Sequence, residues 1–118
     1  MTLKERVCNP DVYPRHQWVF SEEKDYECAV NGIFNSIMTE TPQRQFLQFY
    51  SNQSCYGSSK IAYGYGFCHR RLIPAECTDC LNEAKGLLFD VCTHSIGARV
   101  VLEDCQIRYE NYPFFGPP

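Results

Sequence analysis

The sequence predicts an α+β fold in which two helices pack on an antiparallel sheet. Two segments carry apolar residues at helical spacing, and residues 60–68 alternate strictly between large and small side chains, as a strand does. Eight cysteines are spread over 118 residues. Strands and helices that pack as separate layers are typical of the α+β class. Because the length suits one hydrophobic core, we expect a single domain over residues 1–118.

The cysteines indicate secretion. A domain of this size buries a modest share of its surface, and an even number of dispersed cysteines in a short chain predicts a disulfide framework. Such frameworks form in oxidising compartments. The segment 1–6 lacks the apolar stretch of a signal peptide, so we expect a secretion signal to be removed ahead of Met1.

Charge and hydropathy exclude two classes of partner. The chain has 11 basic and 14 acidic residues, a net charge of −3, and no long run of either sign. Nucleic-acid binding requires a concentrated basic surface. No segment approaches the ~20 apolar residues of a membrane span. We therefore expect neither nucleic acid nor membrane insertion.

Each predicted helix has a recognisable start. Ser21 can cap the first helix, whose first turn holds Glu22 and Glu23, and Thr41-Pro42 ends it. Its apolar face comprises Tyr26, Ala29, Val30, Ile33, Phe34, Ile37 and Met38. The second helix begins at Pro74, which suits a first helical position. Its apolar face comprises Cys77, Cys80, Leu81, Ala84, Leu87, Leu88 and Val91.

The strands follow from alternation and from turn residues. We expect a short strand over 45–50 and a turn-rich connection over 51–59, in which Asn52-Gln53-Ser54 matches an N-glycosylation acceptor. The strand over 60–68 has one face of small residues that lets a helix approach closely. Residues 98–110 supply one or two further strands. Residues 10–17 and the tail from Asn111 are predicted to be irregular.

The sequence holds little catalytic chemistry. Cys77-x-x-Cys80, with His69 and His94 nearby, raises the alternative of a zinc site, but a structural zinc site usually has two such cysteine pairs. Phosphate-binding loops, nucleophile motifs and paired acid–base carboxylates are absent from the sequence. We expect no enzyme activity, no cofactor and no metal.

The cysteine pattern resembles that of a known family. Cys68-x8-Cys77-x2-Cys80-x11-Cys92-x12-Cys105, with Gly97-Ala98-Arg99-Val100 inside it, is similar to the ginkbilobin-like family of secreted antifungal plant proteins. The same domain forms the ectodomains of cysteine-rich receptor-like kinases. The resemblance implies two helices on a five-stranded antiparallel sheet, an apoplastic location and a defence role. It also implies three bridges, Cys8–Cys92, Cys68–Cys77 and Cys80–Cys105. Cys28 and Cys55 are left over, and we expect them to form a fourth bridge.

The resemblance further implies a mannose-binding lectin whose site consists of Asn9, Arg99 and Glu110. A hexose hydroxyl both donates and accepts. The amide of Asn9 does both, Arg99 offers a rigid fork of donors, and Glu110 accepts. Three such groups fix a sugar without a metal, and fungal mannan is the expected target.

Each of these residues also has a purely structural interpretation. Asn9 precedes Pro10 and is a common turn residue. Arg99 can form a surface ion pair with Glu103 or Asp104. Glu110 can be a solubilising charge on an edge strand.

The site also depends on a chain reversal. Arg99 and Glu110 are eleven residues apart, so they share a site only if the chain turns between them. We place that turn at residues 102–105, with Glu103-Asp104 at its tip. One straight strand over 98–110 would exclude the site.

Two alternative functions remain open at this point. One is an extracellular protein-interaction module without an active sugar site, for which protein partners replace the glycan. The other is a structural or storage protein that binds no ligand. The oligomeric state does not follow from the sequence.

Overall fold

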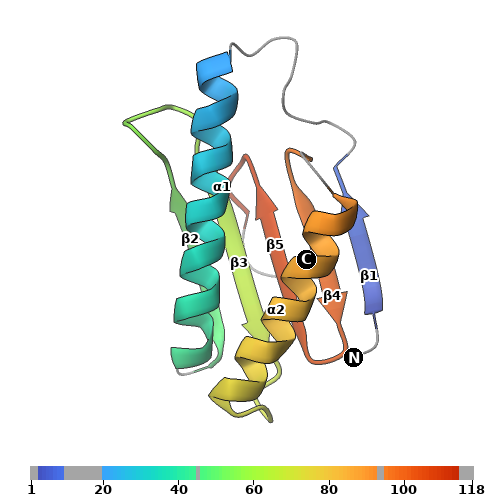
Figure 1. The fold of residues 1–118 in the computed structure, drawn as a ribbon. Coiled ribbons are helices and arrows are strands. Elements are labelled where there is room, and N and C mark those ends of the chain that lie inside the picture. Colours follow the sequence, from blue (N-terminus) through green and yellow to red (C-terminus); the bar gives the residue numbers. More distant parts are fainter. Residues whose placement is uncertain (1–2, 10–19, 45, 93–94, 115–118) are drawn as a thin grey trace.

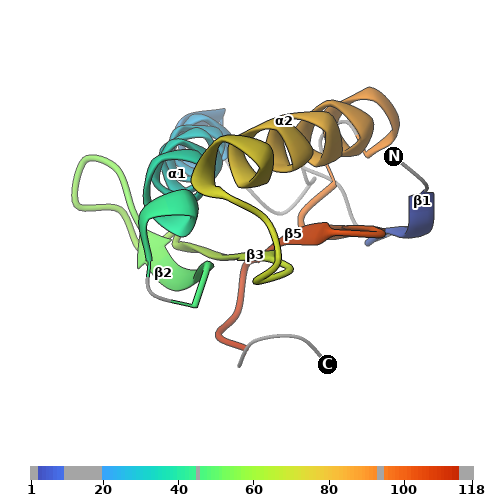
Figure 2. The ribbon, with the colours of Figure 1, turned by 90° about the horizontal axis from the view of Figure 1, so that it is seen from below.

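The structure, a computed structural model, describes residues 3–9, 20–44, 46–92 and 95–114. Two helices lie on one face of a five-stranded antiparallel sheet, which confirms the predicted fold class (Figures 1 and 2). In chain order the elements are β1 (Leu3–Cys8), α1 (Phe20–Glu40), the 3-10 helix η1 (Thr41–Gln43), β2 (Gln48–Gln53), β3 (Ala62–Cys68), α2 (Pro74–Val91), β4 (Ala98–Leu102) and β5 (Cys105–Glu110).

The sheet order is β1-β4-β5-β3-β2, and every neighbouring pair is antiparallel. The first strand of the chain therefore pairs with the fourth, and β1 and β2 form the two edges (Figure 1). Residues 98–110 form a hairpin of two strands rather than one straight strand. The chain therefore reverses between Arg99 and Glu110, as the predicted site requires.

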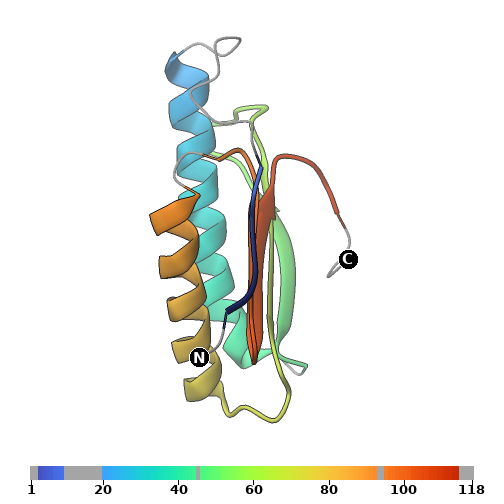
Figure 3. The same cartoon turned by 90° about the vertical axis from the view of Figure 1, so that its right-hand side faces the viewer.

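The small residues of β3 let α1 approach the sheet. A Cβ at position 64 would lie 2.5 Å from Cγ1 of Ile33, and one at position 66 would lie 2.6 Å from Cγ2 of Ile37. Glycine is therefore required at both positions for this packing distance. Edge on, the sheet carries both helices on one side, and the segment after β5 leaves on the other (Figure 3). We call the helix-covered side the inner face and the opposite side the outer face.

The core lies between the sheet and the helices. Its largest fully buried side chains come from both layers and comprise Tyr26, Tyr109, Phe34, Ile33, Ile37, Leu81, Leu88, Ile96, Leu102, Ile107, Val30 and Val100. Phe34 of α1 contacts the rings of Phe89 and Tyr109, with centroids 5.0 and 5.4 Å apart. The aromatic residues thus join both helices to β5.

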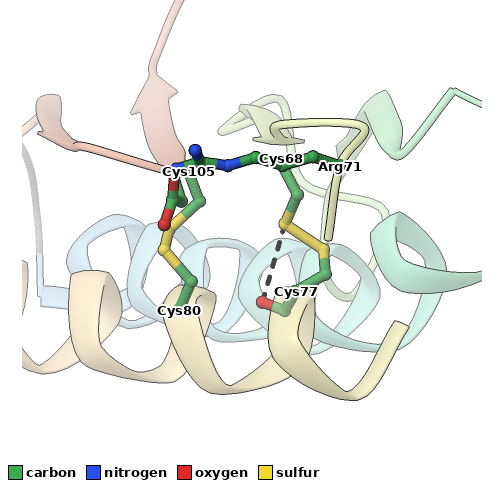
Figure 4. Close-up of a disulfide and its surroundings, with 6 residues drawn as sticks. Cys68, Arg71, Cys77, Cys80 and Cys105 are labelled. Atoms are coloured by element: carbon green, nitrogen blue, oxygen red, sulfur yellow. Dashed lines mark hydrogen bonds and ion pairs between the residues drawn. A yellow bond between two sulfur atoms is a disulfide. The ribbon is translucent and has the colours of Figure 1, made fainter. Parts of the chain in front are cut away.

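Four disulfides hold the layers together, and they are the pairs stated above. The structure joins Cys8–Cys92, Cys28–Cys55, Cys68–Cys77 and Cys80–Cys105. Two of them connect α2 to strands β3 and β5 at one end of the sheet, and the Cys68 sulfur lies 3.6 Å from the carbonyl oxygen of Cys77 (Figure 4). Neither Cys77 nor Cys80 is available as a thiolate, so the zinc alternative is wrong.

Two predicted boundaries are wrong. The first helix begins at Phe20, so Ser21 lies inside its first turn rather than at the cap. The strand expected over 45–50 is β2, at 48–53, because its ladder with β3 runs from Gln48 opposite Phe67 to Gln53 opposite Ala62. Leu47 has a φ of 52°, so the chain turns immediately before β2. The predicted loop over 10–17 and the zinc-ligand candidate His94 lie outside the described residues.

Candidate functional site

The three predicted site residues line one cavity of about 330 Å³. Its wall comprises Val7, Cys8, Asn9, Gly97, Ala98, Arg99, Arg108, Glu110 and Tyr112. They come from β1, the β4–β5 hairpin and the segment after β5. We call this the hairpin pocket. Its volume lies in the range of roughly 300–1,000 Å³ typical of small-molecule sites.

Strand register brings these side chains together. Arg99 of β4 is opposite Arg108 of β5, and Glu110 follows two positions later on the same face. On the other flank Val7 of β1 is opposite Arg99. Since the neighbouring residues Ala98 and Tyr109 point into the core, this set faces the outer side of the sheet.

Asn9 is fixed by the backbone. Its N–H donates to the carbonyl of Gly97 at 2.8 Å, which continues the β1–β4 pairing by one further bond. The backbone of Asn9 is therefore held in place, whereas the structural interpretation treated Asn9 only as a turn residue ahead of a proline. It stands at the end of an ordered strand and beside the pocket.

Arg99 is held by one ion pair and keeps one buried donor unused. Its Nη2 lies 3.0 Å from Oε1 of Glu5. Its Nε is buried and has no hydrogen-bond partner among the described residues. The suggested pairing with Glu103 or Asp104 is wrong, because Asp104 pairs with Arg71 instead. An unpaired buried donor is costly unless a ligand or water meets it.

Glu110 is buried in the middle of the sheet. It is 8% exposed, and β5 lies between β4 and β3, so the interpretation as a solubilising edge charge is wrong. Its Oε2 accepts from Nε of Arg108 at 2.9 Å. The other oxygen, Oε1, faces Gly97, where a Cβ would overlap it. Position 97 has to be glycine for the carboxylate to lie there.

Sequence reasoning missed Arg108 and Tyr112. Arg108 binds Glu110, and its Nη2 donates to the hydroxyl of Tyr112 at 3.2 Å. The guanidinium carbon also lies 4.1 Å from the ring centroid of Phe114. The two-residue spacing from Arg108 to Glu110 was the available signal, because it places both on one face of a strand.

The pocket is polar and electrically balanced. The cations Arg99 and Arg108 each pair with a carboxylate, Glu5 and Glu110. Donors and acceptors without a net charge suit a neutral ligand with many hydroxyls better than an anion. Among the residues the structure describes, no cluster of three or more potential metal ligands occurs. Within the same ranges, no helix has the length and apolar character to cross a membrane.

Comparison with known sequences finds a family and several plant relatives. A family model described as salt stress response/antifungal matches residues 7–112. An antifungal protein, ginkbilobin-like protein 1 of Picea sitchensis, is 45% identical over 56 residues, which is 48% of this chain and 42% of that protein. Plasmodesmata-located protein 5 of Arabidopsis thaliana is 29% identical over 97 residues, 82% of this chain and 32% of that protein. The chain thus spans about half or less of the length of these relatives.

Comparison with solved structures finds the same fold. The tandem DUF26 ectodomain of the Arabidopsis thaliana cysteine-rich receptor-like protein PDLP5 superimposes with a TM-score of 0.74 at 25% identity. The match covers 97% of this chain and 52% of that ectodomain. This chain is therefore similar to about half of a tandem ectodomain.

Proposed function

Because this chain belongs to the salt stress response/antifungal family, we propose that it is an extracellular defence lectin domain that binds mannose. The family assignment confirms the resemblance to ginkbilobin-like proteins. The proposed site is the hairpin pocket, with Asn9, Arg99 and Glu110 as the sugar-binding residues. The proposed activity is sugar binding alone, without a catalytic step or a metal.

One observation supports this proposal above the others. Three residues that are up to 101 positions apart, Asn9, Arg99 and Glu110, line one cavity on the outer face. The guanidinium of Arg99 supplies donors to the lining, and Oε1 of Glu110 lies against Gly97, which also lines the pocket. A donor and an acceptor at fixed positions select the orientation of a pyranose ring.

The biological ligand that fits this proposal is mannan. A single small polar pocket binds a monosaccharide weakly, and a polymer of mannose units compensates through repeated engagement. A fungal cell wall presents such a polymer, which agrees with the antifungal description of the relative from Picea sitchensis. Asn52 is exposed on β2 and is opposite Tyr63, which is itself opposite Glu110, so a glycan there would stand on the same face of the sheet, two strands from Glu110.

The direct test is an NMR titration of the labelled chain with D-mannose, and with D-glucose as the competing hexose. At about 10 mM sugar, well above a dissociation constant of about 1 mM, we expect shifts at residues 9, 99, 108 and 110 for mannose. Arg99→Ala should abolish them. Arg44→Ala, which breaks the exposed ion pair with Glu40 far from the pocket, is the matched control. Unchanged spectra with mannose would overturn the proposal.

A second candidate is a protein-interaction module. It is favoured by the likeness to the PDLP5 ectodomain and by the two ion pairs that occupy much of the charge in the pocket. In that case the pocket residues stabilise the outer face, and a partner protein covers it. Shifts with a protein partner but none with mannose would support this candidate.

A further inference from the structure

A second polar cleft lies at the opposite edge of the sheet from the hairpin pocket. It has a volume of about 510 Å³ and is formed by one side of α1, the end of β2 and the turn that follows. Its lining comprises Lys24, Glu27, Cys28, Asn31, Gly32, Asn35, Gln53 and Tyr56. We call it the amide cleft. In Figure 1 α1, β2 and the loop after β2 lie on the left, away from β1 and β4.

Three carboxamides in the amide cleft are unused. Asn31 and Asn35 are one helical turn apart on α1, and Gln53 faces them from β2. Within the described part of the chain, none of the three side chains makes a hydrogen bond. Gly32 makes the arrangement possible, because a Cβ there would overlap the Gln53 carboxamide. Each amide presents a donor and an acceptor.

An aromatic ring stands at the rim of the cleft. Tyr56 is 87% exposed and has a φ of 57°, a backbone conformation that a bulky residue rarely adopts. The neighbouring Cys55 is bonded to Cys28 of α1, so the bridge fixes this turn against the helix. The ring is therefore presented to solvent at a defined place beside the amides.

The charges of the cleft cancel. Lys24 and Glu27 lie 3.8 Å apart and form an ion pair. The remaining groups are neutral, which disfavours phosphate, nucleic acid or charged peptide as the ligand. Hydroxyl groups match unpaired amides, and the apolar face of a pyranose stacks on an aromatic ring.

We propose that the amide cleft is a second carbohydrate site, which binds a neutral oligosaccharide through Asn31, Asn35 and Gln53 with Tyr56 as the stacking platform. It is separate from the hairpin pocket and does not depend on mannose binding there. Two sites at opposite edges of one sheet let a monomer bridge two stretches of a glycan polymer, which raises avidity without tighter individual sites.

The test is an amide-detected NMR titration of the whole chain with mannotriose and, separately, laminaritriose, to about 10 mM. We expect shifts at residues 31, 35, 53 and 56 with at least one of them, and we expect these shifts to persist in Arg99→Ala. The double variant Asn35→Ala/Tyr56→Ala should lose them. Both residues are exposed, so the fold should be retained.

Two control variants make the result specific. Tyr56→Phe keeps the ring and should keep the shifts. Asn82→Ala removes an exposed amide from α2, outside both pockets, and should also keep them. Shifts that survive in the double variant, or the absence of shifts at the cleft with both sugars, would overturn the proposal. Neither result bears on whether the hairpin pocket binds mannose.

Discussion

Nε of Arg108 donates to Oε2 of Glu110 at 2.9 Å, and both side chains are largely buried, at 14% and 10% exposure. The pair joins two residues of the same strand, and both line the hairpin pocket on the outer face of the sheet. Removing one member leaves a buried charge without its partner, which costs more than the pair contributes.

Arg108→Met is therefore expected to destabilise the chain by about 3 kcal/mol, because the Glu110 carboxylate loses its donor. The double variant Arg108→Met/Glu110→Gln removes both charges and should recover part of that loss. Urea unfolding followed by circular dichroism measures both. If Glu110→Gln lowers stability in the Arg108→Met background by as much as it does alone, the two residues are not coupled and the argument is wrong.

Gly97→Ala is expected to displace the Glu110 carboxylate, since the added Cβ would overlap Oε1 and lie 3.0 Å from the carbonyl oxygen of Tyr109. We expect a loss of about 1–3 kcal/mol and weaker mannose binding. Gly86→Ala is the matched control, because Gly86 is exposed in α2 with nothing within 4 Å of the added Cβ. It should stabilise the chain by about 0.5–1 kcal/mol. Equal changes in stability for Gly97→Ala and Gly86→Ala would refute the steric argument.

The bridge Cys28–Cys55 is expected to stabilise less than Cys8–Cys92. Their sequence separations are 27 and 84, and the entropy of loop closure grows with the logarithm of loop length. Replacing both cysteines of a pair by serine should cost about 3–4 kcal/mol for the shorter loop and about 1 kcal/mol more for the longer one. Denaturant midpoints of the two double variants decide the order, and a reversed order would show that native packing dominates.

Loss of the Cys28–Cys55 bridge should have a second effect. It releases the turn that presents Tyr56, so oligosaccharide shifts at the amide cleft should weaken. Mannose shifts at the hairpin pocket should stay, because that pocket lies at the other edge of the sheet. A parallel loss at both places would indicate global loosening instead.

Burial raises the pKa of Tyr65 above its ordinary value of 10.0. The unfolded chain therefore loses this proton at a lower pH than the folded chain, and stability falls as the pH rises through and above that value. Tyr65→Phe should reduce the difference in urea midpoint between about pH 9 and about pH 11, whereas Tyr56→Phe, at an 87% exposed position, should not. The same pH slope in all three proteins would rule out Tyr65 as a source.

The sequence was sufficient where a pattern reports directly on packing. The alternation from Ile61 to Cys68 predicted β3 and the close approach of α1, and Pro74 marked the start of α2. It was insufficient for β2, where the six residues Gln48–Gln53 alternate weakly on an edge strand and the register is set by β3. The turn at Glu103-Asp104 was predictable because Arg99 and Glu110 can share a site only if the chain reverses between them.

The site was only partly predictable for the same reason. Asn9, Arg99 and Glu110 followed from a resemblance, and the structure brings them to one pocket. Glu5 did not follow, since the pairing of β1 with β4 brings it to Arg99 from a segment distant in sequence, and Arg108 did not follow although it lies two residues from Glu110 on the same strand. The amide cleft escaped prediction because Gln53 meets Asn31 and Asn35 only after β2 is placed beside α1.

The pairing of β1 with β4 has a consequence for biosynthesis. A ribosome releases the chain from its N-terminus, so Cys8 emerges long before Cys92, and Cys28 is the next thiol to appear. A bridge between Cys8 and Cys28 at that stage is non-native and must be exchanged before β1 can join the sheet. Cys68 and Cys77, nine residues apart, meet without this delay. Maturation of this protein should therefore depend on a disulfide isomerase at the N-terminal strand far more than at the α2 bridges.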